Sequence, residues 1–464
     1  DRSPHPSIHE VKYLQQPVEF SVDFESGNLK IRNNFSFMRL DVFNILWKVK
    51  FDNERKAISG ILNLPAVSAN SECVIPWRQE LPNLGSIAES LQFKECWIEF
   101  FVVLKESSSW APKGHIIAQE QILMPRSNKP ETKKKVVLSA EKYKLQIVHE
   151  NYDILTIESS SGMRVGFFKS GEKFGCISQI YMNDKMLVCS GPSPNFLRAP
   201  IDNDYGGEVF SYVNRWRNAE IESFVLARNT NTSGMNYSFD SNGIFNISFQ
   251  CWIVRRGDKS NTKMNLVMEY SVKPSGIIFL DVSIQKVASL PPLARVGLSM
   301  TCSDELQGIE WFGRGKHECY SDRKASAFVD RYSSTVEELH VPYIFPSENG
   351  GRSDVRWLTL RPICDKTHGI FVSARSQSLF QMSISNYTIE ELTRAKHQDD
   401  LVKSKYVEVH LDHLHMGLGG DDSWSPSVHK DALIDDSGWK FGLVLTPIHS
   451  QIDASDLYCL VDGS

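Results

Sequence analysis

Short segments in which hydrophobic and polar residues alternate run through most of the chain. Early examples are residues 18–22, 29–32 and 45–51, and a longer one covers residues 96–104. Alternation of this kind predicts strands of a sheet with one buried face, because successive side chains of a strand point to opposite faces. The alternating pattern therefore predicts an immunoglobulin-like β-sandwich for residues 18–125.

A polar, lysine-rich stretch separates this region from the rest of the chain. Residues 126–135 contain Pro130 and three consecutive lysines, Lys133–Lys135. Such a composition is typical of a connecting segment, and we take residues 126–140 as a linker. The alternation then continues to residue 448, which is too long for one small sandwich. Residues 141–448 therefore predict a second, large antiparallel β-sandwich.

Few helices are expected. Residues 388–397 are the best candidate, because Thr388 and Glu391 have the spacing of a capping box. Residues 7–16 are a weaker candidate. Strands do not alternate with helices of about ten residues, so neither a (β/α)8 barrel nor a doubly wound parallel sheet is predicted. We expect an all-β chain that contains no catalytic barrel.

Composition and charge narrow the possible functions. The chain has 464 residues, with 51 Lys and Arg against 56 Asp and Glu, and no long block of either sign. A nucleic-acid-binding surface is therefore not indicated. Hydrophobic residues make up 41%, but no apolar run approaches the roughly 18 residues of a membrane span. We expect neither nucleic acid nor a membrane as a partner.

Cysteines and glycosylation motifs say little about the compartment. Nine widely spaced cysteines form no C-x-x-C pair, and we expect reduced, packed thiols. Five N-x-S/T tripeptides leave glycosylation and export open, because such tripeptides also arise by chance. They begin at Asn34, Asn231, Asn236, Asn246 and Asn386. We expect a cytoplasmic protein.

One histidine-rich run has the composition of a metal site. It reads HLDHLH and covers residues 410–415. On a regular strand His413 and His415 share one face, whereas His410 and Asp412 share the other. Four ligands cannot converge from opposite faces without a sharp bend. We therefore expect ordinary sheet histidines and no metal site.

Two acidic clusters lie in glycine-bearing turns, at residues 199–207 and 416–426. Their polar side chains are Asp202, Asn203 and Asp204 before Gly206, and Asp421, Asp422 and Ser423 before Trp424. Paired carboxylates could serve a glycosidase as acid and nucleophile. We favour the alternative that they bond to nearby backbone N–H groups and fix the turns. Trp424 is different, because an indole among small and polar residues suits the apolar face of a sugar.

At these turns the sequence closely resembles the C-terminal portion of glycoside hydrolase family 2 β-galactosidases, most of all the plant-type members. The matching blocks are RAPIDND at 198–204, ARVGL at 294–298, WFGRGKHECYSDRK at 311–324, PYIFPSENG at 342–350 and LHMGLGGDDSWSPSV at 414–428. The opening residues DRSPHP resemble the segment that leaves the family's catalytic barrel. The resemblance thus covers nearly the whole chain.

The resemblance also implies a division of the chain into five parts. The parts are a remnant of the barrel exit at 1–17, the immunoglobulin-like sandwich at 18–125, the linker at 126–140, the small-chain sandwich at 141–448 and a divergent tail at 449–464. In this family both catalytic glutamates and the Mg²⁺ ligands, with any Na⁺ ligands, lie in the barrel, which would precede residue 1. We therefore expect no catalytic residue and no cofactor in this chain.

By resemblance, the chain serves a retaining β-galactosidase that hydrolyses terminal non-reducing β-D-galactose residues. Trp424 would reach into the barrel's active site as a platform for the sugar. The loop at Asp202, Asn203, Asp204 and Gly206 would border that site and move on binding. The turn that presents Trp424 would be supported by His415, Asp421, Asp422 and Ser423. Expected partners are the galactoside, the barrel section or large chain, and further copies in a homo-oligomer.

Two other hypotheses remain open. The chain could be a stand-alone carbohydrate-binding protein, or an inactive fragment of an incomplete gene. The family usually has proline where Lys316 stands and often where Ser321 stands, which is consistent with a truncated or decaying copy. Apolar surface beside Trp424 would favour a section that docks on a barrel, whereas a closed polar rim would favour a lectin.

Overall fold

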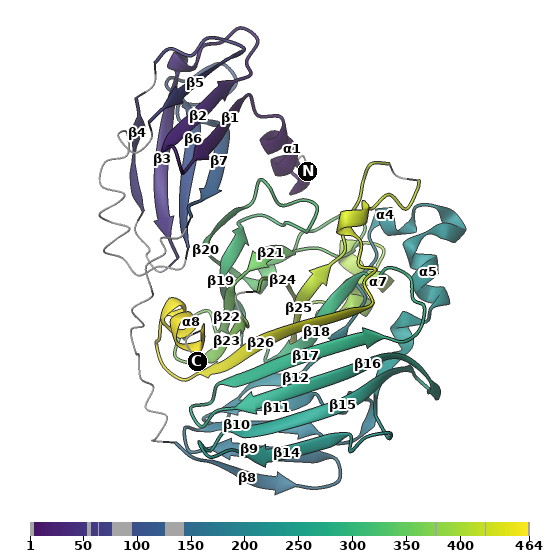
Figure 1. The fold of residues 1–464 in the computed structure, drawn as a ribbon. Helices are drawn as coiled ribbons and strands as arrows, with labels where there is room; N and C mark the ends of the chain where they lie inside the picture. The colour runs from purple at the N-terminus through teal and green to yellow at the C-terminus, as the bar shows by residue number, and fades with distance from the viewer. Residues whose placement is uncertain are drawn as a thin grey trace. The chain divides into compact units, whose positions relative to one another are not determined.

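The computed structural model describes residues 4–52, 57–63, 65–76, 95–125, 143–375, 378–422 and 424–462. Contacts within the chain divide it into two compact units, Asp1–Lys134 and Lys135–Ser464, each built mainly of strands (Figure 1). The division falls in the predicted linker, residues 126–140, which lies outside the described residues.

Unit 1 contains two antiparallel sheets, with strand orders β1-β2-β5 and β4-β3-β6-β7. Burial alternates along β3, and Phe20 stacks on Phe100 with ring centroids 4.9 Å apart. The predicted sandwich is thus confirmed. The strands are β1 (Val18–Asp23), β2 (Asn28–Asn33), β3 (Phe43–Phe51), β4 (Ile58–Leu62), β5 (Ser71–Ile75), β6 (Cys96–Leu104) and β7 (Ile116–Leu123).

A short helix, α1 (Ser7–Leu14), precedes β1, where the sequence predicts a helix at residues 7–16. Tyr13 donates from its hydroxyl to the Glu120 carboxylate on β7 at 2.8 Å. The side chain of Gln16 accepts a hydrogen bond from the backbone N–H of Gln119 at 2.9 Å. These bonds attach α1 to the sheet that contains β7. A 3-10 turn, η1 (Leu40–Val42), leads into β3.

Unit 2 is the large antiparallel sandwich that the sequence predicts. Its first sheet, sheet I, has the order β21-β24-β25-β18-β12-β11-β10-β9-β8. These strands are β21 (Arg352–Val355), β24 (Phe380–Ser385), β25 (Val407–His415), β18 (Arg295–Cys302), β12 (Lys185–Asn195), β11 (Ile177–Met182), β10 (Met163–Phe168), β9 (Ile154–Ser159) and β8 (Leu145–Glu150).

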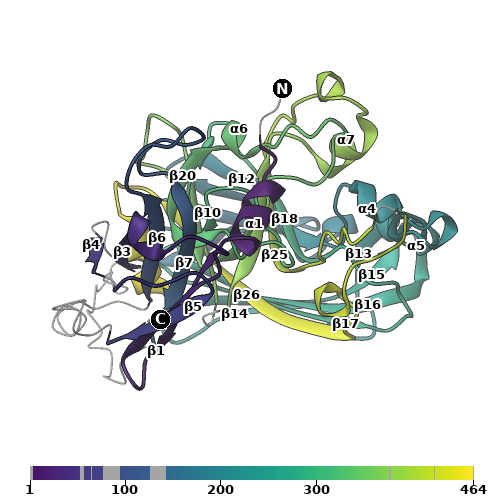
Figure 2. The same cartoon turned by 90° about the horizontal axis from the view of Figure 1, so that it is seen from above.

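The second sheet, sheet II, has the order β13-β15-β16-β17-β26-β23-β22-β19-β20, and β14 also pairs with β15. These strands are β13 (Phe224–Arg228), β14 (Met235–Phe239), β15 (Phe245–Arg255), β16 (Asp258–Val272), β17 (Ile278–Lys286), β26 (Gly438–Ile448), β23 (Gly369–Ala374), β22 (Trp357–Arg361), β19 (Gly308–Gly315) and β20 (Phe328–Thr335). Figure 2 gives a second view of both sheets.

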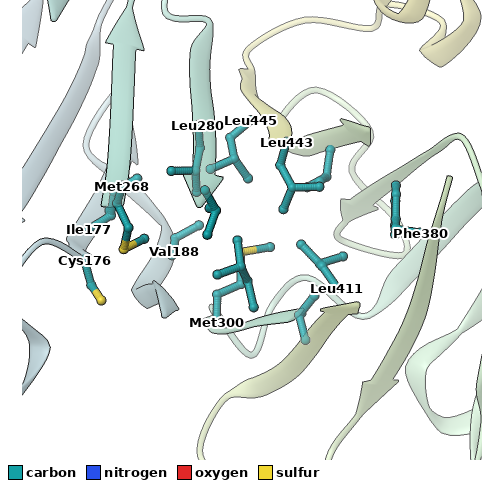
Figure 3. Packing of buried hydrophobic residues seen from close by; sticks show 14 of the residues in the cluster. Cys176, Ile177, Val188, Met268, Leu280, Met300, Phe380, Leu411, Leu443 and Leu445 are labelled. Carbon is teal, nitrogen blue, oxygen red and sulfur yellow. The ribbon is translucent and has the colours of Figure 1, made fainter. Parts of the chain in front are cut away.

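The core of unit 2 lies between sheets I and II. Met300 and Leu411 reach it from sheet I, and Leu280 and Leu443 reach it from sheet II (Figure 3). All four side chains are buried, as the alternation in their strands requires. Most of the cysteines are packed, as expected: five are buried and Cys73 and Cys189 are half-buried, whereas Cys364 and Cys459 are exposed.

Unit 2 also contains several short helices. They are α4 (Asp202–Tyr205), α5 (Tyr212–Asn218), α6 (Val336–Leu339), α7 (Ile389–Arg394) and α8 (Ala454–Asp462), with 3-10 turns η3 (Gly171–Lys173), η4 (Glu208–Phe210), η5 (Ile221–Ser223), η6 (Gln398–Asp400) and η7 (Lys430–Ala432). Within the part of the chain that the structure describes, none is long and apolar enough to cross a membrane.

Helix α7 confirms the prediction at residues 388–397, with one difference at its start. Thr388 Oγ1 accepts a hydrogen bond from the backbone N–H of Glu391, as a capping residue should. The Glu391 carboxylate bonds to the backbone N–H of Val402 at 2.7 Å and to the Arg394 guanidinium. The first half of the predicted capping box is therefore present, while the glutamate ties α7 to the segment that follows it.

A β-bulge in β25 overturns the predicted faces of the histidine run. Val296 pairs with Leu414 and Gly297 pairs with Asp412, so His413 is an extra residue in the ladder. An extra residue reverses the alternation, and His415 therefore lies on the same side as Asp412. His413 instead stacks on Phe441, with centroids 5.0 Å apart. Our expectation that His413 and His415 share a face is wrong.

Candidate functional site

Arg198 joins two loops of unit 2 that are far apart in the sequence. We call residues 198–210 the α4 loop and residues 416–426 the Trp424 loop. The Arg198 guanidinium donates to the Asp204 carboxylate at 2.7 and 3.0 Å. It also donates to the backbone oxygens of Met416 at 2.9 Å and Gly417 at 3.1 Å. Both side chains of the ion pair are fully buried, so Arg198 holds the two loops together on their buried side.

Contacts nearer the surface also join the α4 loop to the Trp424 loop, and we call this region of contact the junction. Asn203 donates from Nδ2 to the Leu418 backbone oxygen at 2.9 Å. At Gly207 the backbone has φ +90°, and an added Cβ would lie 2.7 Å from the Pro426 ring. Glycine is therefore needed there, both for the left-handed conformation and for the close approach. The α4 loop and the Trp424 loop form one packed unit.

Trp424 projects from a turn that Asp422 holds. Asp422 Oδ1 accepts from the backbone N–H of Trp424 at 3.0 Å and of Ser425 at 2.7 Å, and Oδ2 accepts from Ser425 Oγ at 2.6 Å. The bonds from Ser425 and from the Trp424 amide lower the pKa of Asp422. The indole itself is 75% exposed. A fixed backbone thus presents a bare aromatic face to solvent. Ser423 lies outside the described residues.

The other carboxylates at the junction differ in their surroundings. Asp204 is buried and, besides pairing with Arg198, accepts from the backbone N–H of Ile201 at 3.0 Å. Asp202 is exposed at the start of α4, which replaces the simple turn that the sequence suggested. Asp421 pairs with His429 at 2.6 Å and raises the pKa of that histidine. Asp204 and Asp422 are thus engaged in bonds that hold the loops.

Exposed apolar side chains lie on the α4 loop next to this junction. Val209 and Phe210 are each 69% exposed, and Tyr205 is 39% exposed. They flank Gly206 and Gly207, which touch Ser425 and Pro426 of the Trp424 loop. We call Tyr205, Val209, Phe210 and Trp424 the apolar rim. Sequence reasoning did not single out the first three, although Val209 and Phe210 form an isolated apolar pair in a polar stretch.

A buried ionic cluster lies directly before the Trp424 loop. Arg295 donates from Nη2 to Glu348 Oε2 at 2.6 Å, and its Nη1 lies 3.7 Å from Asp412 Oδ2. His415 Nε2 is 3.5 Å from the same guanidinium. All four side chains are almost fully buried. A single arginine therefore faces two carboxylates and an imidazole.

Burial sets the charge states in this cluster. It raises the pKa of Asp412 to about 7 and also raises that of Glu348. It lowers the pKa of His415 well below the usual value, so this imidazole is neutral at pH 7. His415 Nδ1 lies 2.8 Å from the Met416 backbone oxygen, which can only accept. Nδ1 therefore carries the proton, and Nε2 is free to accept from Arg295.

His415, which the sequence predicts to support the Trp424 turn, has its ring buried beside Arg295 and Glu348. Its backbone oxygen accepts from Ser321 Oγ at 2.9 Å. Sequence reasoning assigned no role to Arg198 or Arg295, because their partners come from distant strands and loops. Among the described residues, no group of three or more His, Cys, Asp or Glu side chains is placed to hold a metal ion.

Comparison with known proteins gives two matches to protein families and several to curated proteins. The family described as β-galactosidase small chain matches residues 162–445, and the one described as β-galactosidase domain 4 matches residues 29–125. The β-galactosidase of Psychromonas ingrahamii is 28% identical over 462 residues, which cover 96% of this chain and 41% of that protein. The β-galactosidase of Pseudoalteromonas haloplanktis is 30% identical over 465 residues, with the same coverage.

Solved structures are similar to this chain only at low sequence identity. A galactose 1-epimerase from Lactobacillus acidophilus covers 67% of this chain at 9% identity with a TM-score of 0.33, and we draw nothing from it. The curated relatives are more informative, since the chain spans about two fifths of their length. The small-chain match covers more than half of the chain and includes both loops of the junction. The chain therefore belongs to the β-galactosidase family, and it carries the small-chain sandwich preceded by domain 4 of that family.

Proposed function

We propose that this chain is the C-terminal section of a retaining β-galactosidase and supplies Trp424 as an aromatic platform for the galactose ring. The observation that carries the proposal is the exposed indole on a turn held by Asp422 and fastened to the α4 loop through Arg198. A fixed aromatic face binds the apolar face of a sugar with little loss of conformational entropy. The Trp424 loop is built for such a role.

The apolar rim favours docking on a barrel section over a lectin role. Val209 and Phe210 are mostly exposed beside the Trp424 loop. Contiguous exposed apolar side chains are unfavourable in water and mark surfaces that a partner covers. A lectin would surround its platform with polar groups instead. The partial coverage of the relatives agrees with this preference, because the remaining three fifths of such an enzyme would provide the covering surface.

The catalytic groups would come from that remaining part. In this proposal its two glutamates act as acid/base and nucleophile, and it also holds Mg²⁺, with Na⁺ as a second expected ion. This chain's residues would orient the sugar and exclude water from one side of it. Asp204 and Asp422, which each accept three hydrogen bonds, are bound to Arg198 and to Ser425. They are therefore poor candidates for a nucleophile, and we expect the isolated chain to be inactive.

Two preparations test the proposal together. The isolated chain should hydrolyse o-nitrophenyl β-galactoside no faster than buffer does. A chimera in which it replaces the matching region of the Pseudoalteromonas haloplanktis enzyme should hydrolyse the same substrate. Turnover by the isolated chain that disappears in the Asp204→Asn or Asp422→Asn variant would contradict the proposal. A folded chimera without activity would equally contradict it.

A further inference from the structure

A cavity of about 590 Å³ opens in unit 2 beside β13, the edge strand of sheet II. Its walls are β13, the η3 turn between β10 and β11, and the hairpin that joins β15 to β16. The volume lies within the roughly 300–1,000 Å³ of ordinary ligand pockets. None of its lining residues belongs to the α4 loop or the Trp424 loop. The cavity is therefore separate from the junction that carries Trp424.

Apolar side chains form part of the lining of this cavity, and its mouth is open. Phe174, Leu226, Val254 and Met235 supply apolar lining. At the mouth, Gly171 borders free space, because an added Cβ there would meet no atom within 4 Å. A partly apolar lining with an open mouth suits a ligand that has at least one hydrophobic face.

Three charged side chains of the lining are paired with partners of opposite sign, whereas the Arg228 guanidinium bonds to the Ser233 backbone oxygen. The ion pairs are Lys169 with Glu150 at 2.6 Å, Arg255 with Glu220 at 2.7 Å and Glu172 with Arg256 at 3.0 Å. A strongly anionic ligand would have to displace the partners of Lys169 and Arg255, and a cation would have to displace the partner of Glu172. A neutral ligand with hydroxyl groups can instead share their remaining donor and acceptor positions.

Tyr152 adds a flat aromatic surface at the same mouth. It lines the cavity, and its side chain is 84% exposed. Its turn is held by Asn151 Oδ1, which accepts from the backbone N–H of Asp153 at 2.9 Å and of Ile154 at 2.7 Å. Asp422 holds the turn at Trp424 by a similar pair of backbone bonds, although Trp424 lies two residues after Asp422 and Tyr152 directly follows Asn151. Each turn presents an exposed aromatic ring from a fixed backbone.

We propose that this cavity binds a neutral saccharide unit, with Tyr152 against the apolar face of the sugar ring. Lys169, Arg228 and Arg255 would donate hydrogen bonds to hydroxyl oxygens, and Glu172 would accept from a hydroxyl. Arg228 is held for this role by its bond from Nη2 to the Ser233 backbone oxygen at 2.6 Å. The chain then has a saccharide site besides Trp424. This inference does not depend on the catalytic role proposed above.

Saturation-transfer NMR on the isolated full chain tests the inference, with lactose as the neutral probe and galacturonate as its anionic counterpart. We expect a lactose signal that persists in Trp424→Ala and Tyr152→Phe. It should weaken about 2- to 10-fold in Tyr152→Ala, which loses a stacking contact. Because Tyr152 is mostly exposed, the variants should unfold at the same temperature as the parent chain, and this is the folding control.

Five results would overturn the inference. These are no lactose signal from the parent chain, a signal unchanged in Tyr152→Ala, a signal abolished by Trp424→Ala alone, stronger binding of galacturonate than of lactose, and loss of the signal in Tyr152→Phe. The first would exclude a saccharide site for this probe class. The second and third would move the ligand away from the cavity, and the fourth would make the site anionic. The fifth would contradict a stacking role.

Discussion

Replacing Arg198 by methionine should destabilise unit 2 strongly and release both loops at once. The variant leaves the Asp204 carboxylate buried without its cation, and it leaves the backbone oxygens of Met416 and Gly417 without their donor. Removing one partner of a buried ion pair costs about 3–5 kcal/mol, because the other charge stays desolvated. Each lost carbonyl bond adds about 1 kcal/mol. We expect a total of about 5–7 kcal/mol.

Two further variants separate this effect from a general loss of packing. Arg198→Met combined with Asp204→Leu removes both charges, so no carboxylate remains unpaired in the core. The double variant should therefore be more stable than Arg198→Met alone by about 2 kcal/mol or more. Asn203→Ala removes only the bond from Nδ2 to the Leu418 oxygen, and it should cost about 1 kcal/mol.

Urea unfolding monitored by tryptophan fluorescence measures these free energies, and hydrogen exchange reports on the loops. In Arg198→Met the amides of the α4 loop and of the Trp424 loop should exchange faster together, because one guanidinium holds both. A cost below about 1 kcal/mol would refute the argument that the buried pair is essential. So would a double variant that is no more stable than Arg198→Met alone, since removing the unpaired carboxylate would then have no effect.

Three other substitutions give separate checks. Trp424→Ala should cost no more than about 1.5 kcal/mol, since only a quarter of the side chain is buried. Trp311→Ala should cost about 3–5 kcal/mol, because that indole is fully buried and donates to the Arg314 backbone oxygen at 3.0 Å. Equal unfolding midpoints for the Trp424→Ala and Trp311→Ala variants would contradict this difference in cost. The stability advantage of Asp412→Asn over the parent chain should grow as pH rises from 4 to 7. The pKa of Asp412 in the parent is about 7 in the folded state and near 3.8 in the unfolded state, so ionisation favours the unfolded parent over this range, whereas the asparagine does not ionise. The gain should reach at most about 4 kcal/mol above pH 7, and a gap between the two unfolding curves that does not change with pH would contradict it.

The alternation of residues was sufficient to predict both sandwiches, because most strands keep one face in a core. It failed at His413, where the strand is irregular. The bulge there depends on Gly297 of the neighbouring strand, where an added Cβ would lie 2.4 Å from Asp412 Oδ1. A close approach between residues 115 positions apart leaves no local pattern in the sequence. Period-two reasoning therefore assigns faces correctly only until the first bulge.

The C-terminal helix could have been predicted, whereas the junction could not. Ala454, Leu457 and Val461 are buried and have helical spacing, but we treated residues 449–464 only as a divergent tail. The exposure of Trp424 was predicted from its position on a polar, glycine-rich loop together with the family resemblance. The role of Arg198 was hidden, because it depends on backbone oxygens more than 200 positions away.

The most direct test of the account is the Michaelis constant for o-nitrophenyl β-galactoside in the chimera, measured with and without Trp424. Trp424→Ala should raise KM about 5- to 150-fold, which corresponds to a lost stacking contact of about 1–3 kcal/mol. Val209→Ala, a change of similar exposure on the apolar rim, is the matched control and should leave KM within about twofold. An unchanged KM in Trp424→Ala, in a chimera that is folded and active, would contradict the platform role of this residue.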